Sequence, residues 1–162
     1  MKKLSIYFFL VGLIFVLSSC PESTSVPLAS KGTVKLEKTL IGTWETDDLD
    51  INLEKFTVSQ NDQFSYKVAA DIWDDITEDT ETEYYIAWLV PVNDQKFVVA
   101  QKTVDNKTEN TFYLYNYKFE NGKLVLQSLN IESSVLSNIK TSEEYMKTLK
   151  SAMAKGNFLT SE

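Results

Sequence analysis

A succession of short β-type segments between residues 40 and 130 constrains the fold of this chain more than any other feature of its sequence. Each segment has seven to twelve residues, is rich in β-branched and aromatic side chains, and ends at turn-forming residues. The predicted strands are Leu40–Thr46, Asp50–Ser59, Gln63–Ala70, Thr82–Val90, Lys96–Val104, Glu109–Glu120 and Lys123–Asn130. Dipeptides typical of hairpin turns stand between successive strands: Asn61-Asp62, Asn93-Asp94, Asp105-Asn106 and Asn121-Gly122. Hairpin connections between sequential strands predict an antiparallel meander.

One side of the predicted sheet is heavily aromatic. Successive side chains of a strand point to opposite faces, so alternate positions share a face. The aromatic residues that alternate in this way are Tyr113, Tyr115, Tyr117 and Phe119 in one strand, Phe64 and Tyr66 in a second, and Tyr84 and Trp88 in a third. A meander with one apolar face covers that face by closing into a barrel or by folding into a sandwich. We expect a mainly β fold in which the meander closes into a barrel, with a sandwich as the second choice.

A helix is predicted over residues 142–155, after the last strand. Thr141 and Glu144 fit a capping box at its start, and Gly156 fits a stop at its end. An apolar stripe follows at helical spacing: Tyr145, Met146, Leu149, Ala152 and Met153. We expect this stripe to pack on the sheet, and the alternative is a helix that binds a partner or lies on a membrane.

The first twenty residues have the order of an export signal. Lys2 and Lys3 precede an apolar run over residues 4–17, which at about fourteen residues is shorter than the roughly twenty that a membrane-spanning helix needs. Leu17-Ser18-Ser19-Cys20 follows directly and resembles the bacterial lipobox, in which the cysteine is acylated before cleavage. The resemblance implies a signal peptide at residues 1–19 and a membrane-anchoring lipid on Cys20. The alternative is an ordinary secretory signal with a chance cysteine.

The mature chain divides into a short linker and one domain. Residues 20–35 are mostly small or polar, so we expect a lipidated cysteine followed by a flexible tether. Residues 36–162 form the expected domain, which includes the helix. Cys20 is the only cysteine, so no disulfide can form within the chain, and the 143 residues from Cys20 onward are enough to bury one core.

Histidine and arginine are both absent from the chain. Their absence excludes the Ser-His-Asp and Cys-His catalytic arrangements, histidine metal sites and guanidinium clamps for phosphate. Removal of the signal leaves fourteen lysines against twenty-three acidic residues, and a net charge near −9 disfavours nucleic acid as a partner. No glycine-rich phosphate loop is present. We therefore expect a protein that is not an enzyme, with no catalytic residue, no metal and no cofactor.

Gly42-Thr43-Trp44, at the start of the first predicted strand, resembles the Gly-x-Trp signature of lipocalins and lipocalin-like proteins. The strand meander and the C-terminal helix extend the resemblance in outline over most of the mature chain. It implies a lipocalin-like barrel in which Gly42 and Trp44 are structural and Trp44 closes one end. The chain lacks the arginine that usually stacks on this tryptophan and the family's second Thr-Asp-x motif. The resemblance also implies that a small apolar ligand is held in the barrel.

Six aromatic residues are candidates for the wall of such a ligand site. They are Tyr66, Tyr84, Trp88, Tyr113, Tyr115 and Tyr117. Buried phenol hydroxyls need hydrogen-bond partners, which favours a wet or ligand-facing wall. The alternative is that these side chains fill a solid core or lie on the outer face of the sheet.

The segment Asp71–Glu83 holds seven acidic residues and no basic one. Carboxylate clusters bind calcium, but the spacing differs from an EF-hand loop, so we expect a solvated connection between strands. Ile72 and Trp73 within it are apolar residues among acids, a combination typical of a protein-docking tip.

The sequence therefore predicts a lipoprotein of the cell envelope, held to a membrane by the lipid on Cys20. Its expected role is non-enzymatic binding of a small apolar ligand in a lipocalin-like barrel. The alternative role is docking to an envelope protein through the acidic segment around Trp73 or through the C-terminal helix.

Overall fold

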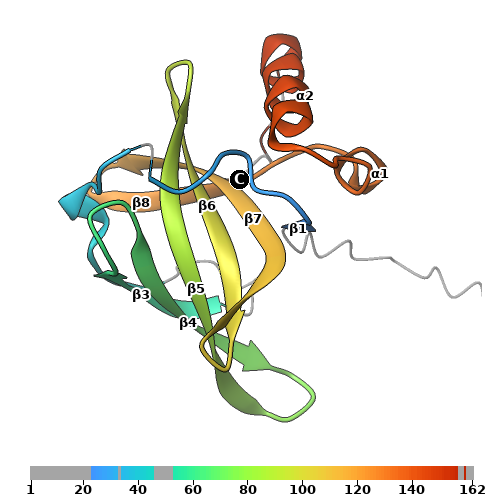
Figure 1. The fold of residues 1–162 in the computed structure, drawn as a ribbon. Coiled ribbons are helices and arrows are strands. Elements are labelled where there is room, and N and C mark those ends of the chain that lie inside the picture. The colour runs from blue at the N-terminus through green and yellow to red at the C-terminus, as the bar shows by residue number, and fades with distance from the viewer. Residues whose placement is uncertain (1–22, 33, 46–52, 157–158, 160–162) are drawn as a thin grey trace, which may run out of the picture.

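A computed structural model describes residues 23–32, 34–45, 53–156 and 159 of the chain. The predicted signal peptide and Cys20 lie outside these described residues. The elements in chain order are β1 (Ser23–Thr24), the 3-10 helix η1 (Lys38–Leu40), β2 (Gly42–Glu45), β3 (Leu53–Gln60), β4 (Tyr66–Asp74), β5 (Asp79–Val92), β6 (Gln95–Val104), β7 (Lys107–Glu120), β8 (Lys123–Ser128), α1 (Ser133–Leu136) and α2 (Ser142–Lys155). Figure 1 shows a curved sheet with both α-helices outside the curve.

The eight strands form one antiparallel sheet in the order β1-β7-β6-β5-β4-β3-β2, and β8 also pairs with β7. From β2 to β8, each strand therefore pairs with the next strand in the sequence, and the predicted meander is confirmed. Two-residue turns at Asn93-Asp94, Asp105-Asn106 and Asn121-Gly122 connect the later hairpins. Asn93, Asn106 and Asn121 have positive φ angles of 53°, 61° and 51°, which asparagine tolerates better than most residues.

The sheet is curled but is not a closed barrel. Within the described part of the chain, β2 pairs only with β3, and no ladder joins β2 to β8. The edge of β7 that faces away from β6 pairs with two strands instead. β1 pairs with Phe112 and Tyr113, and β8 pairs with the residues from Tyr115 onward. Side chains of β2 and β7 approach one another without a hydrogen-bonded ladder between these strands: the ring centroids of Trp44 and Phe119 lie 5.9 Å apart. The expected mainly β meander is present, and closure of the barrel is not confirmed.

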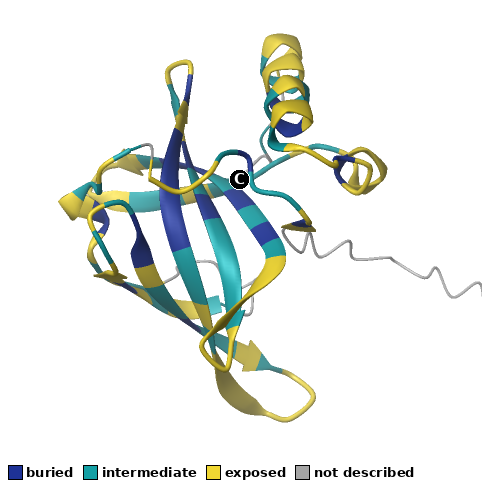
Figure 2. Ribbon diagram, viewed as in Figure 1, coloured by how far each residue is buried: buried dark blue, intermediate teal, exposed yellow. Residues whose placement is uncertain are grey.

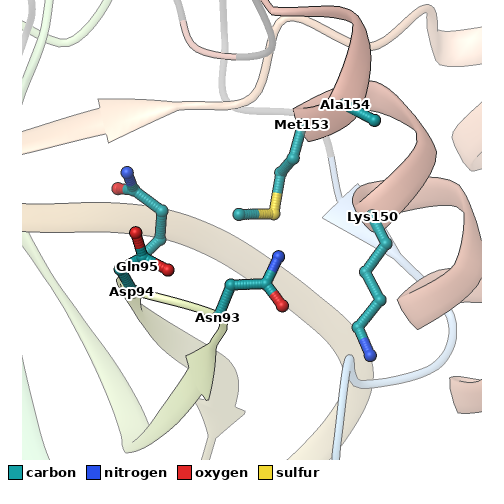
Figure 3. A pocket seen from close by; sticks show the side chains of 6 residues that line it. All are labelled: Asn93, Asp94, Gln95, Lys150, Met153 and Ala154. Carbon is teal, nitrogen blue, oxygen red and sulfur yellow. The ribbon is translucent and has the colours of Figure 1, made fainter.

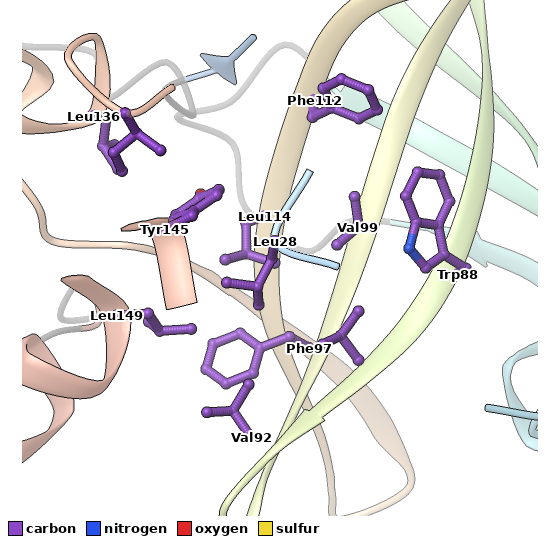
Figure 4. Packing of buried hydrophobic residues seen from close by; sticks show 12 residues of the cluster. Leu28, Trp88, Val92, Phe97, Val99, Phe112, Leu114, Leu136, Tyr145 and Leu149 are labelled. Carbon is purple, nitrogen blue, oxygen red and sulfur yellow. The ribbon is translucent and has the colours of Figure 1, made fainter. Parts of the chain in front are cut away.

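The core lies on both faces of the sheet. Inside the curve, Leu40, Val58, Tyr66, Ala87, Leu89 and Tyr117 form what we call the concave cluster. On the outside, a larger convex cluster contains Leu28, Trp88, Val90, Val92, Phe97, Val99, Phe112, Leu114, Leu136, Ile139, Tyr145 and Leu149 (Figure 4). Alternate residues of β5 belong to different clusters, so residues 87–90 are all buried (Figure 2). A continuous apolar run is what a strand covered on both faces requires.

Residues 23–29, which we call the N-terminal strap, begin as β1 beside β7 and continue over the convex face of the sheet. Leu28 is 1% exposed in the convex cluster, and the indole nitrogen of Trp88 donates a 2.9 Å hydrogen bond to the carbonyl of Ala29. The hydroxyl of Ser142 donates a 2.7 Å bond to the carbonyl of Pro27. This differs from the flexible tether expected for residues 20–35. The strap has few apolar residues, but these residues cover a part of the convex face that the helices leave uncovered.

Helix α2 has the predicted bounds, caps and packing. The Thr141 hydroxyl accepts a hydrogen bond from the Glu144 backbone, and the Glu144 carboxylate accepts one from the Thr141 backbone. Gly156 ends the helix with a φ of 72°. Tyr145 and Leu149 are 2% and 0% exposed in the convex cluster, so the apolar stripe packs on the domain as expected. The single-turn helix α1 was not predicted.

Candidate ligand site

The two ends of the curled sheet differ in what covers them. At the end we call the plugged end, the segment before β2 crosses the concave face: the Tyr66 hydroxyl accepts a 2.8 Å hydrogen bond from the Glu37 N–H and donates a 3.1 Å bond to the Glu37 carbonyl. Trp44 donates a 3.0 Å bond from its indole nitrogen to the Leu40 carbonyl. Gly42 has a φ of 152°, which side chains other than glycine rarely adopt. The other end, where the β4–β5 and β6–β7 hairpins turn, we call the hairpin end.

The structure separates the six aromatic residues predicted to line a ligand site. Tyr66, Tyr113, Tyr115 and Tyr117 share the concave face, as their registers with Ala87, Ala100, Val98 and Leu126 indicate. Tyr84 and Trp88 lie on the convex face. Tyr84 is 58% exposed there, whereas Trp88 is 4% exposed beneath the strap. Because β5 carries aromatic residues at consecutive positions 84 and 85, alternation alone could not decide which of them points inward.

The four concave tyrosines are divided again along the face. Tyr66 and Tyr117 are buried in the concave cluster near the plugged end, where they are part of a filled core. Tyr113 and Tyr115 lie farther toward the hairpin end and are half-buried. Only the second pair is therefore placed where a small molecule could reach it from solvent.

A polar group that the sequence analysis missed lies beside these tyrosines. The Glu83 carboxylate accepts hydrogen bonds from the Lys102 ammonium and the Tyr85 hydroxyl. The Tyr85 ring packs edge-on against Tyr113, with 5.9 Å between ring centroids and an interplanar angle of 78°. We call Glu83, Tyr85 and Lys102 the Glu83 cluster. Its sequence signal was the alternation of Glu83 and Tyr85 on one face of a strand, but their pairing with Lys102 depends on the β5–β6 register.

The charges of the Glu83 cluster stabilise one another. Burial alone would raise the pKa of Glu83, but hydrogen bonds from Lys102 and Tyr85 and the charge of Lys102 outweigh burial and lower it. The hydrogen bond to Glu83 raises the pKa of Lys102. Burial and the hydrogen bond to Glu83 raise the pKa of Tyr85. At neutral pH the group is thus an ion pair with a neutral phenol.

We predict that this ion pair makes stability depend on pH. The folded pKa of Glu83 lies below its ordinary value of 4.5, so the stabilisation is complete above that value and is lost as pH falls through the folded pKa. Both side chains are more than a quarter exposed, so we expect only about 1 kcal/mol. Glu83→Gln should be less stable than wild type at pH 7, and urea titrations should show this difference shrinking as the pH falls below 4.5. A difference that does not change with pH would contradict the prediction.

A second carboxylate, Asp62, also titrates at acidic pH but does not affect this comparison. Asp62 accepts a 2.8 Å hydrogen bond from the Phe64 N–H, which lowers its pKa to about 2. Asp62 therefore titrates in the same acidic range, but it does so in both proteins. The comparison of Glu83→Gln with wild type cancels its contribution.

Near the plugged end, the Tyr117 hydroxyl is buried and has no hydrogen-bond partner of ordinary geometry among the described residues. Burial and the neighbouring Glu37 carboxylate raise the pKa of Tyr117. Lys96 pairs with Glu37 at 2.9 Å and lies 6.0 Å from the Tyr117 ring centre. This phenol stays neutral at physiological pH and lies within the filled part of the concave face.

The acidic segment Asp71–Glu83, which was predicted to be a solvated connection between strands, is mostly strand. Strand β4 continues to Asp74 and β5 begins at Asp79, so the two extend the sheet as a projecting hairpin (Figure 1). β-forming residues occupy many of the paired positions, and the Thr82 hydroxyl donates a 2.8 Å hydrogen bond to Asp71 across the hairpin. Among the described residues, no three acidic side chains converge in a way that could hold a metal ion.

The projecting hairpin carries apolar side chains as well as acids. Ile76 is 93% exposed and Trp73 is 37% exposed. They border a shallow hollow of about 350 Å³, together with Ile72, Asp74, Asp75, Glu81 and Glu83. Glu83 belongs both to this hollow and to the concave face, so the hollow adjoins the Glu83 cluster.

A second hollow of about 250 Å³ lies between the β5–β6 turn and α2 (Figure 3). Its walls are mainly polar at the turn, with Asn93, Asp94 and Gln95, while Lys150, Met153 and Ala154 come from the helix. The hollow is shallow and open, and none of the predicted site residues reaches it. The hairpin end therefore carries the stronger case for binding.

None of the described helices is long and apolar enough to cross a membrane. Comparison of the chain with known protein families, curated proteins and solved structures found no match. The lipocalin-like resemblance of Gly42-Thr43-Trp44 therefore stays a prediction, and the case for function depends on the residues of this chain.

Proposed function

We propose that this chain is a lipid-anchored binding protein of the bacterial cell envelope, held to a membrane through Cys20. Its ligand is a small amphiphilic molecule that contacts the concave face at the hairpin end. The observation that carries the proposal is the half-buried wall of Tyr85, Tyr113 and Tyr115 beside the Glu83–Lys102 pair. Phenol rings offer apolar area, and their hydroxyls and the ion pair offer hydrogen bonds, which is the mixture that small-molecule sites use.

The proposed ligand lies near the hairpin end, because side chains already fill the other half of the concave face. Leu89 and Tyr66 are 4% and 1% exposed there, and the segment before β2 crosses that end. A ligand at the plugged end would have to displace packed side chains, which cores resist.

Charge narrows the class of ligand. Asp74, Asp75, Glu81 and Glu83 line the hollow beside the site, and Lys102 is already paired with Glu83. A carboxylate or phosphate head group would meet these acids, which disfavours fatty acids and anionic lipids. The proposed ligand is therefore neutral or cationic.

The proposed role is binding without catalysis. The lowered pKa of Glu83 leaves it without a proton to donate at neutral pH, and both of its oxygens already accept hydrogen bonds. A general acid or base needs a free, suitably poised group, and the Glu83 cluster supplies a fixed ion pair instead.

Native mass spectrometry of the chain from Pro21 onward tests the proposal. The segment before Lys35 must be kept, because the strap is part of the core. We expect a discrete added mass that is lost on denaturation, and that is also lost in Tyr113→Ala. Tyr84→Ala is the matched control, since Tyr84 is a tyrosine on the opposite face and should leave the added mass in place. Loss of the added mass in both variants, or in neither, would contradict the assigned site.

The exposure of Ile76 favours a second function, docking of an envelope protein on the β4–β5 hairpin. Ile76 is 93% exposed next to Trp73, so its burial against a partner protein would be energetically favourable. Helix α2 is the weaker docking element, since its stripe is already packed. Crosslinking in intact cells tests the idea: Ile76→Asp should remove a crosslinked partner, and Val104→Asp on the neighbouring β6–β7 hairpin should not.

A further inference from the structure

The strap begins very close to the proposed anchor. Strand β1 starts at Ser23, which is three residues after Cys20. Ser23 pairs with Tyr113 and Thr24 pairs with Phe112, so the chain is part of the sheet from this point. The linker available between lipid and domain is therefore Pro21 and Glu22 alone, and not the stretch to residue 35 that the sequence suggested.

Covalent geometry limits how far such a linker reaches. A fully extended chain spans at most about 3.5 Å per residue, so the step from Cys20 to Ser23 covers at most about 10 Å. The acyl chains on Cys20 lie in the bilayer, which places Cys20 at the membrane surface. The point where the domain attaches is thus no more than about 10 Å from the lipid head groups.

The strap does not serve as a longer tether, because its contacts hold it on the domain. Detaching it would expose Leu28 and break the hydrogen bonds from Trp88 to Ala29 and from Ser142 to Pro27. The Thr24 side chain also hydrogen-bonds to Tyr145 at the start of α2. Exposure of a fully buried leucine to water is unfavourable, and the loss of these hydrogen bonds adds to that cost.

We propose that the domain rests directly on the membrane, with β1 and the start of α2 beside the lipid head groups. This inference rests on the lipid anchor of the proposed function. The place where the strap joins the sheet sets which side of the domain faces the bilayer. Electrostatic attraction to lipid head groups does not set it, because the exposed residues there include the acids Glu143 and Glu144 as well as Lys140 and Lys147 and form no basic patch. The β4–β5 hairpin projects away from α1 and α2 (Figure 1), which keeps its apolar tip off the bilayer.

Fluorescence quenching on vesicles tests this placement in the full lipidated protein. Cys20 is the only cysteine, and acylation uses its thiol, so one introduced cysteine is the only site for a thiol-reactive dye. Glu143→Cys places the dye at the start of α2, and Ile76→Cys places it at the hairpin tip. Both proteins are incorporated into phosphatidylcholine vesicles whose head groups carry a quencher.

We expect the dye at position 143 to lose most of its fluorescence and the dye at position 76 to lose much less. A matched variant has about twenty Gly and Ser residues inserted after Glu22, which adds a coil of about 25 Å. Insertion should restore the fluorescence at position 143. Unchanged quenching after insertion, or equal quenching at the two positions, would overturn the inference.

Intact mass measurement separates this inference from the function on which it rests. A mass without acyl chains would overturn the anchor itself, and the placement with it. A correctly acylated protein whose dye at position 143 is not quenched would overturn the placement alone and leave the anchor standing.

Discussion

Leu28→Ala is expected to lower the free energy of unfolding by about 2–5 kcal/mol, the usual range for a buried leucine. Leu28 is 1% exposed in the convex cluster, although it lies within sixteen residues whose composition is that of a linker. The loss combines the transfer of its side chain to water with the cavity left against the sheet. Urea unfolding of the chain from Pro21 onward, with tryptophan fluorescence as the signal, measures the change.

Ser30→Ala is the matched control for this experiment. Ser30 is exposed at the end of the same segment, so its loss should change stability by less than about 0.5 kcal/mol. If Leu28→Ala were equally neutral, the strap would be a detachable tether, and the short distance between membrane and domain would no longer follow.

The strap also shows why the domain boundary could not be predicted from composition. A flexible tether was predicted because many residues between Pro21 and Lys35 are small or polar. Among the described residues of this stretch, Val26, Leu28 and Ala29 pack on the convex cluster and Val34 packs on the concave cluster. So few residues leave no periodic signal, and the uncovered surface that they fit exists only after the sheet and helices have formed.

The strands and α2 were predictable because their signals are local. Asn121-Gly122 sets a hairpin turn, and Thr141 with Glu144 sets a helix start, within a few residues. Closure of the barrel was not predictable in this way. It depends on which edges pair, and here the long strand β7 offers one edge to both β1 and β8.

The candidate site was predicted only in part, for a related reason. Alternation correctly grouped Tyr113, Tyr115 and Tyr117 on one face, because they lie in the same strand. It could not relate β5 to β7, so Tyr84 and Trp88 were assigned to a wall that they do not share. The Glu83–Lys102 pair joins residues nineteen positions apart and needs the register of two strands.

The position of the candidate site has consequences for the proposed function in the cell envelope. The Glu83 cluster and the β4–β5 hollow adjoin at the hairpin end, while the strap joins the convex face beside α2. The strap and the proposed binding surface therefore lie mainly on opposite faces of the sheet, but they meet at β7, where Ser23 pairs with Tyr113. If β1 holds the domain at the bilayer, the Tyr113 part of the ligand wall lies near the membrane, and the β4–β5 hairpin projects away from it.

Leu149→Ala is expected to have an effect as large as that of Leu28→Ala, about 2–5 kcal/mol. Leu149 is 0% exposed and belongs to the same convex cluster, so the helix covers the sheet rather than presenting its apolar stripe to a partner. Lys150→Ala, at the next position on the exposed side of the helix, should be nearly neutral. Urea unfolding again measures both.

The result for Leu149 decides between two uses of α2. A helix that served mainly to bind a partner would lose little stability on truncation of Leu149, because the side chain would be solvent-exposed in the free protein. A loss of about 2 kcal/mol or more assigns the stripe to the core and leaves the β4–β5 hairpin as the proposed surface for protein docking. Because Leu28 and Leu149 share one cluster, the double variant should also show an interaction energy between the two sites, as neighbouring core positions usually do.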